Sequence, residues 1–95
     1  MASSRFPQNF IEEVRAASDI VALISDYVRL KKTGQNFVGL CPFHSENTPS
    51  FTVNQQRQMF YCFGCNAGGD VFEFIMKQEG LDFLGAVRLL ADRAH

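Results

Sequence analysis

Cys41-Pro-Phe-His44 and Cys62-Phe-Gly-Cys65 are the two stretches that decide how this chain folds. In each stretch two residues separate a pair of donors, and seventeen residues lie between the stretches. A short loop with this spacing supplies two ligands from one side, and two such loops close a tetrahedral zinc cage. All three cysteines of the chain lie in these stretches. Cys41, His44, Cys62 and Cys65 are therefore the predicted metal ligands.

The composition limits what surrounds this site. The chain has 95 residues, 46% of them hydrophobic, with ten phenylalanines, which predicts one compact domain whose modest core a metal ion would help to stabilise. No apolar run approaches the roughly 18 residues of a membrane span, and the first residues lack the apolar segment of a signal peptide. We expect a cytoplasmic protein without a membrane partner. In that reducing compartment, an odd number of cysteines favours metal ligation over disulfides.

Other interpretations of the cysteines are a thioredoxin-like dithiol at Cys62 and Cys65, or unrelated buried thiols. A redox dithiol needs an exposed cysteine of low pKa at a helix N-terminus. This pair instead ends an expected strand, and a dithiol leaves Cys41 and His44 unexplained. An iron-sulfur centre usually takes four thiolates, and the chain has three cysteines. Zinc is the preferred interpretation.

A catalytic zinc keeps one coordination position open for water and has a general base nearby. Four protein ligands fill the tetrahedron, and Glu46 is the only carboxylate close to a ligand in the sequence. We therefore predict a structural zinc and no catalytic residue in this chain. His95, at the end of the sequence, is expected to be solvated and not a ligand.

The hydrophobic pattern predicts helices, then an antiparallel sheet, then helices, an α+β fold. Pro7 opens a first helix, and a second helical segment follows Asp19. From Tyr27 the apolar period changes to two, which predicts strands in two hairpins. The turns and strands expected after it are the turn 32–35, the strand 36–40, the strand 50–54, the turn 55–57 and the strand 59–61.

Glycines and helix-capping residues after the second ligand pair predict two more helices. Gly68-Gly69 is expected to break the strand; it could also hold an anion, but a turn and a helix cap explain it more simply. Asp70 and Glu73 form a capping box that opens one helix, which Gly80 ends. Asp82 caps the last helix.

Charge is unevenly distributed although the net charge is only −1. The segment 28–65 carries a formal +3 and the rest of the chain −4. A zinc ion with three thiolates adds about −1, so this segment stays near +2 when metallated. Its cations are Arg29, Lys31, Lys32 and Arg57.

Aromatic residues divide into two groups by pattern. Phe51, Phe74 and Phe83 have the spacing of buried residues. Phe37, Phe60 and Tyr61 lie on expected strands beside the cations. An exposed ring on a cationic sheet can stack an unpaired base, worth about 1–3 kcal/mol per base. For each of these three, stacking and core packing both remain open.

Two stretches of the chain carry a resemblance to a known family. They are Lys31-Lys-Thr-Gly-Gln through Cys41-Pro-Phe-His44 to Pro49-Ser-Phe51, and Phe60-Tyr-Cys62-Phe-Gly-Cys65 with Gly68-Gly-Asp70. Together they closely resemble the N-terminal zinc-ribbon domain of bacterial-type DNA primases. The resemblance runs from about Pro7 to the end of the chain.

This resemblance implies a zinc ribbon on an antiparallel sheet with flanking helices. Residues 1–95 are then a single zinc-binding domain, the N-terminal module of a larger primase. Its implied role is to bind single-stranded DNA at primer initiation sites during DNA replication. A separate polymerase domain, which uses Mg, makes the RNA primer, and a replicative helicase is a partner of the full-length protein. The expected nucleic-acid contacts are Arg29, Lys31, Lys32, Asn36, Phe37, Arg57, Phe60 and Tyr61.

Two positions depart from the family pattern. Asn47 stands where the family often has lysine, which removes one phosphate contact, and Asn66 stands where it often has glycine. Neither position is a ligand. A zinc ribbon that binds protein and no nucleic acid is the alternative function, since it needs the same metal site but neither the cations nor exposed aromatics.

Overall fold

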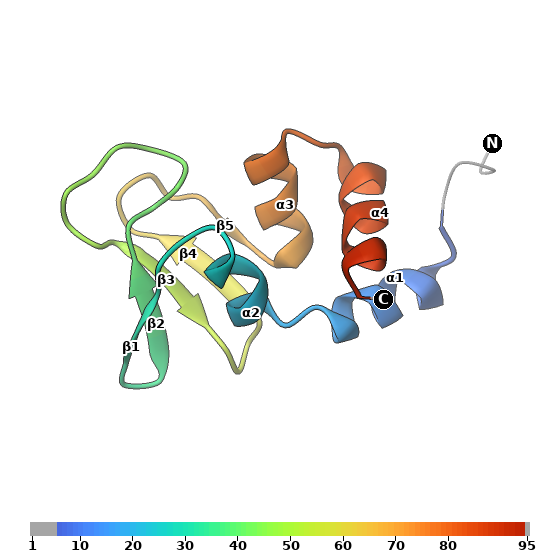
Figure 1. The fold of residues 1–95 in the computed structure, drawn as a ribbon, viewed down its shortest axis with the longest axis horizontal. Coiled ribbons are helices and arrows are strands. Elements are labelled where there is room, and N and C mark those ends of the chain that lie inside the picture. Colours follow the sequence, from blue (N-terminus) through green and yellow to red (C-terminus); the bar gives the residue numbers. More distant parts are fainter. Residues whose placement is uncertain (1–5, 95) are drawn as a thin grey trace.

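A computed structural model of the chain describes residues 6–94, so His95 lies outside the described part. The elements form one sheet with helices before and after it in the sequence, which confirms the predicted α+β class (Figure 1). In chain order they are α1 (Gln8–Ala17), α2 (Ile20–Ser25), β1 (Lys31–Thr33), β2 (Asn36–Gly39), β3 (Phe51–Asn54), β4 (Met59–Cys62), β5 (Gly68–Gly69), α3 (Val71–Glu79) and α4 (Phe83–Arg93).

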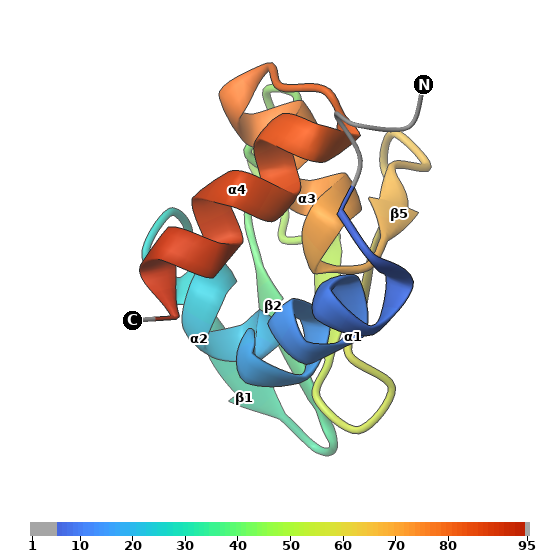
Figure 2. The ribbon, with the colours of Figure 1, turned by 90° about the vertical axis from the view of Figure 1, so that its right-hand side faces the viewer.

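The sheet is an antiparallel meander in which each strand pairs with its neighbours in the sequence, in the order β1-β2-β3-β4-β5. Figure 1 shows the sheet towards one end of the molecule and α1 and α4 towards the other. Viewed from the helical end, α4 crosses in front of α3, and α1 lies beside it (Figure 2). Contacts between α3 and α4 and between α1 and α4 join these helices. None of the helices within residues 6–94 has the length and hydropathy needed to cross a membrane.

Side chains alternate between the two faces of the sheet, as the period of a strand requires. One face is buried under helices and presents Phe51, Val53, Phe60 and Cys62. The opposite face, called the open face below, consists of residues in register across four strands and is half-buried to exposed. Its members are Lys31, Thr33, Asn36, Val38, Thr52, Asn54, Met59 and Tyr61.

Four aromatic rings form the centre of the core, and we call them the phenylalanine cluster. Phe43 comes from the loop between β2 and β3, Phe51 from β3, Phe60 from β4 and Phe74 from α3. Their ring centroids lie 5.4 to 6.3 Å apart. This cluster joins the loop that carries two candidate ligands to the sheet and to α3.

The predicted helix starts and the end at Gly80 are confirmed, but within residues 6–94 the Asp70 amide makes no hydrogen bond to the Glu73 carboxylate, so the capping box is only half formed. Asp19 accepts a hydrogen bond from the Ala22 amide and caps α2. The Asp70 carboxylate accepts from two amides of the first turn of α3, and Asp82 accepts from the first turn of α4. Gly80 ends α3 with φ of 66°, in the left-handed region that glycine adopts without strain.

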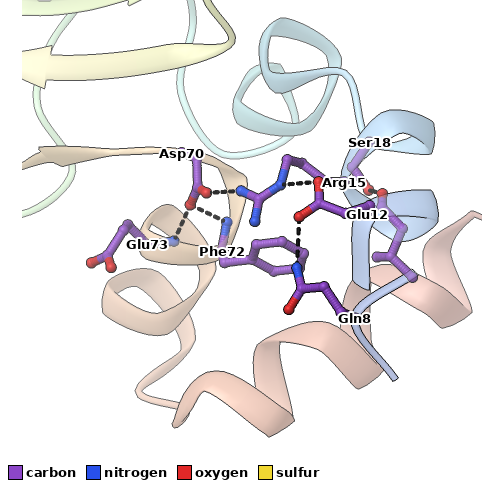
Figure 3. Close-up of polar contacts among 8 residues, drawn as sticks. Gln8, Glu12, Arg15, Ser18, Asp70, Phe72 and Glu73 are labelled. Carbon is purple, nitrogen blue, oxygen red and sulfur yellow. Dashed lines mark hydrogen bonds and ion pairs between the residues drawn. The ribbon is translucent and has the colours of Figure 1, made fainter. Parts of the chain in front are cut away.

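Arg15 connects α1 to the start of α3 (Figure 3). Its guanidinium pairs with the Asp70 carboxylate and lies over the Phe72 ring, with 4.9 Å from the guanidinium carbon to the ring centroid. Glu12, one turn earlier on α1, accepts from the Arg15 Nε at 3.2 Å. Asp70 is therefore both a helix cap and the anchor of α1.

Three sequence predictions are wrong in detail. The strand expected from Tyr27 begins only at Lys31, because the amides of Tyr27 and Val28 donate to the Ile24 carbonyl and continue the last turn of α2. Gly68-Gly69 does not break the sheet but pairs with β4 as β5. Phe83, the first residue of α4, is 38% exposed, and its ring meets the Phe72 ring edge to face.

Candidate metal centre

The four candidate ligands come from two loops that the sheet brings together. Cys41 and His44 lie in the loop after β2, Cys62 ends β4, and Cys65 lies in the turn that follows. One ligand atom from each residue lies within 4.8 Å of all the others. The Cys41 and Cys65 sulfurs are 3.8 Å apart, and two sulfurs on one tetrahedral zinc, each at roughly 2.3 Å from it, stand roughly 3.8 Å apart. The donor set therefore fits a zinc ion.

Backbone amides point at the sulfur atoms in both loops. The Phe43 amide donates to the Cys41 sulfur at 3.4 Å, and the Gly64 amide donates to the Cys62 sulfur at 3.3 Å. Each donor lies two residues after its cysteine, so both loops fold into the same kind of tight turn. Such bonds stabilise a thiolate.

Asn66 closes the second turn with φ of 67°, in the left-handed region. Asparagine tolerates this conformation better than other residues with a side chain, so it can replace glycine at this point of the turn. Its amide donates to the Cys62 carbonyl at 2.8 Å, and its side-chain oxygen accepts from the Tyr61 hydroxyl at 2.7 Å. Asn66 thus keeps the turn that places Cys65.

The two ring nitrogens of His44 have different surroundings. Nε2 lies 3.1 Å from a carboxylate oxygen of Glu46. Nδ1 is buried and has no hydrogen-bond partner within residues 6–94. A buried polar atom without a partner is costly, and a metal ion bound at Nδ1 removes that cost. Nδ1 is thus the nitrogen available for ligation.

The surroundings shift the pKa of two of the cysteines in opposite directions. Burial raises the pKa of Cys41 to about 12. For Cys62, burial also acts upward, but polar contacts of its sulfur with the Ser50 side chain and with the Cys65 and Gly64 amides outweigh it and lower the pKa to about 7. A buried thiol such as Cys41 becomes a thiolate when a cation binds it, which is consistent with a metal-binding role.

The carboxylate nearest to the ligands is already engaged. Glu46 accepts hydrogen bonds from the Ser50 hydroxyl and from the Cys41 and Ser50 amides, and these bonds lower its pKa. With four protein donors in place and this carboxylate occupied, the site has the composition of a structural centre.

The cations predicted to contact nucleic acid are exposed at two places. Arg29, Lys31 and Lys32 lie at or beside β1, and Arg57 lies in the turn between β3 and β4. Asn36 lies on the open face, where it accepts from the Asn54 amide group at 3.2 Å. Lys31 belongs to the open face, whereas Lys32 pairs with Phe37 and lies on the opposite face of β1. The contacts of all these residues with nucleic acid stay a prediction.

The predicted stacking aromatics separate by face. Tyr61 lies on the open face and is 39% exposed. Phe60 is 2% exposed in the phenylalanine cluster, so the prediction that it contacts a base is wrong. Phe37 pairs with Val53, and Val53 pairs with Phe60, so Phe37 also lies on the buried face. The Phe37 ring is half-buried, and the Lys32 ammonium lies 6.0 Å from its centroid. Phe60 and Tyr61 lie on different faces because successive side chains of a strand point to opposite sides of the sheet.

Phe63 is an exposed aromatic that the sequence analysis missed. It is 71% exposed, and its ring meets the Tyr61 ring edge to face at 4.9 Å between centroids. A signal was present, because Phe63 lies in the tight turn between two predicted ligands, beyond the alternating strand pattern that assigns residues to the core. A hollow runs from this pair along the sheet, lined by Asn36, Thr52, Asn54, Arg57, Met59, Phe60, Tyr61 and Phe63.

Comparisons with known proteins agree with one another. Residues 6–95 match a family model described as CHC2 zinc finger. The DNA primase of Halalkalibacterium halodurans is 53% identical over 93 residues, which cover 98% of this chain and 16% of that protein. The DNA primase of Listeria monocytogenes is 51% identical over 92 residues, covering 97% of this chain and 15% of that protein. This chain spans about one sixth of the length of these relatives.

A solved structure is similar over most of the chain. It is the crystal structure of the Aquifex aeolicus primase, containing its zinc binding and RNA polymerase domains. The match has a TM-score of 0.86 and 44% sequence identity, and it covers 90% of this chain and 21% of that chain. The fold described above is therefore also present in an experimental primase structure.

Proposed function

The chain belongs to the CHC2 zinc finger family of bacterial DNA primases, and on that premise we propose that it holds single-stranded template DNA at primer initiation sites. Residues 1–95 act as one zinc-binding domain at the N-terminus of a larger primase. A separate polymerase domain, with its own Mg, joins the ribonucleotides. The part proposed for this chain is to hold the start site in place, so that initiation gains from proximity.

One structural zinc ion is the proposed cofactor, held by Cys41, His44, Cys62 and Cys65. The clustering of their ligand atoms and the unpartnered Nδ1 of His44 support this assignment. When bound, the ion cross-links the two loops. These residues then keep the end of β4 and the following turn in place beside the open face.

The observation that carries the DNA-binding proposal is the exposed ring pair of Tyr61 and Phe63 at the open face. Arg57 lines the same hollow as the two rings. Across the sheet, Lys31 of the open face lines a second groove together with Arg29. Rings stack on bases and cations neutralise phosphates, so the open face has both contacts that a single strand needs.

Titration of this chain with a labelled single-stranded oligonucleotide tests the proposal. We expect affinity to fall as salt rises, and to fall further when Lys31 and Lys32 are both changed to alanine, because fewer phosphates are neutralised. Phe63→Ala should remove a stacking contact worth about 1–3 kcal/mol, or roughly 5- to 150-fold in affinity. The matched control is Phe83→Ala, which removes a 38% exposed ring from α4.

Absence of binding, or binding that is independent of salt, of the lysines and of Phe63, would contradict the DNA-binding proposal. Absence of binding would favour the second candidate, a module that binds protein. The observation behind that candidate is a largely apolar groove beside β1, with Leu40 48% exposed; it is lined by Tyr27, Val28, Arg29, Lys31, Val38, Gly39, Leu40, Pro42 and Pro49. Its proposed partners are the polymerase domain and, for the full-length protein, a replicative helicase, to be tested by pull-down without nucleic acid.

A further inference from the structure

We infer that Glu46 is the positioning residue of the metal centre, and that its carboxylate selects the tautomer in which His44 binds zinc through Nδ1. This inference rests on the proposed zinc site. Glu46 lies two residues after His44, and its side chain is only 11% exposed. Its two oxygens face four donors in the loop between β2 and β3.

The first oxygen, Oε1, connects the histidine to the following strand. It lies 3.1 Å from His44 Nε2 and accepts from the Ser50 hydroxyl. An ionised carboxylate is only an acceptor, so the ring nitrogen that faces it carries the hydrogen. That leaves the lone pair on Nδ1, the nitrogen that is buried and unpartnered. The carboxylate thereby orients the ring and makes Nδ1 a better ligand.

The second oxygen, Oε2, holds the backbone on both sides of the histidine. It accepts from the Cys41 amide at 2.8 Å and from the Ser50 amide at 3.3 Å. The carboxylate therefore ties the first ligand of the loop to the residue just before β3. Glu46 fixes the loop at both ends with the same group that orients His44.

Ser50 extends this arrangement to the second ligand pair. Its hydroxyl oxygen lies 3.5 Å from the Cys62 sulfur. The ring of His44 also lies against the second loop, because a Cβ added at Gly64 would be 2.8 Å from Nε2. Glu46 thus contacts two ligands of the first loop directly and reaches Cys62 through Ser50. No other carboxylate within residues 6–94 forms a hydrogen bond or ion pair with this loop.

Glu46→Gln separates the tautomer role from simple loop support. An amide side chain keeps one oxygen for the Cys41 and Ser50 amides, but it then presents an N–H₂ group to His44 Nε2. That group disfavours a hydrogen on Nε2 and shifts the histidine towards the tautomer whose Nδ1 is protonated. Glu46→Ala removes both roles. Glu13→Gln, on the exposed side of α1, makes the same change of charge away from the site.

The test measures zinc affinity of the whole chain by competition with a chelator, and records the ring nitrogen signals of His44 by NMR. We expect Glu46→Gln to bind zinc 10- to 100-fold more weakly than the parent, as loss of a partner of a metal ligand does. Glu46→Ala should bind at least as weakly, and Glu13→Gln should match the parent. In the zinc-bound parent, we expect the hydrogen on Nε2 and the metal on Nδ1.

Each other result has a definite meaning. If the parent binds zinc and Glu46→Gln binds it equally well, the positioning role is wrong while the zinc site stands. The inference is also overturned if the parent NMR signals place the hydrogen on Nδ1. If the parent binds no zinc, the proposed cofactor is wrong and this inference goes with it. Ser50→Ala, which keeps the carboxylate, should weaken zinc binding less than Glu46→Gln.

Discussion

The loops that carry the candidate ligands differ sharply from the helices in what holds them in place. In the segments 40–50 and 63–66, called the ligand loops here, Cys41 is the one buried residue. In the helices α1, α3 and α4, called the helical part, nine apolar residues are buried: Ile11, Val14, Val71, Phe72, Phe74, Ile75, Ala86, Val87 and Leu90. The helical part can be ordered by burial of its apolar side chains, whereas the ligand loops need a metal ion bound to their ligands.

The phenylalanine cluster is where these two regions meet. Phe43 belongs to a ligand loop, and Phe74 belongs to α3. Their ring centroids are 5.6 Å apart, and the ammonium of Lys77, also on α3, lies 5.7 Å from the Phe43 centroid. A change in one region can therefore reach the other through this contact. How strongly the two regions are coupled is the quantity that the following predictions measure.

Loss of the metal should have the largest effect. We expect a strong chelator, or Cys62→Ser, to remove hydrogen-exchange protection from the ligand loops and the ends of β2 and β4. The helical part should keep part of its far-UV signal, because its apolar core remains. Zinc binding contributes roughly 10–16 kcal/mol in isolated zinc-finger peptides. Unchanged near-UV and far-UV spectra with zinc retained would contradict the structural assignment.

Phe74→Ala should have the next largest effect, and it should reach both regions. The side chain is 0% exposed and contacts the other three rings of the cluster. Replacing a buried phenylalanine by alanine costs about 3–5 kcal/mol of stability. We expect the urea midpoints measured by the helix signal and by zinc release to shift by the same amount. If only the helix signal shifts, the ligand loops are independent of α3; Phe83→Ala should cost less than Phe74→Ala.

Two helix caps of the helical part should differ in strength. Asp70 caps α3 through two amides and also pairs with Arg15, whereas Asp82 caps α4 through the Gly85 amide at 2.8 Å. Loss of a cap costs about 0.5–2 kcal/mol, and a partly exposed ion pair adds little. We expect Asp70→Ala near the upper end of that range and Asp82→Ala near the lower end, by urea unfolding. Equal values would mean that neither the second capped amide nor the pair with Arg15 adds to stability.

Two glycines give the smallest and most closely matched comparison. Gly34, in the turn between β1 and β2, has φ of +64°, and Gly80, after α3, has φ of +66°; an added Cβ meets no atom within 4 Å at either. Alanine should therefore cost about 1–2 kcal/mol of local strain at both. We expect the full cost at Gly80 but less at Gly34, because β1 can open locally. Equal costs by thermal unfolding would mean that the outer hairpin and the helices unfold as one unit.

The sequence was sufficient to predict the structure wherever a residue type at a given spacing has one common structural role. Spacing alone identified Cys41, His44, Cys62 and Cys65 as candidate ligands, and the structure brings their ligand atoms together. The helix caps were also predictable, because an aspartate before an apolar helical pattern has few other roles.

The sequence was ambiguous wherever two neighbouring residues could exchange faces. Phe60 and Tyr61 are adjacent aromatics, so alternation says that they point in opposite directions but not which one is buried. Cys62 could have decided this, because a buried metal ligand two residues after Phe60 places both on the buried face. Phe63 was missed because an apolar residue is normally assigned to the core, whereas the turn between two ligands directs it outwards.

The outermost strand of the sheet has a consequence for handling this protein. β1 pairs with β2 on one side only, and its three residues, Lys31, Lys32 and Thr33, are all exposed. An unpaired strand edge is a template for another chain, and lysine on it discourages such pairing. The same ammonium groups proposed to meet phosphates therefore also keep copies of the molecule apart. A variant without them should show a greater tendency to self-associate as its concentration rises.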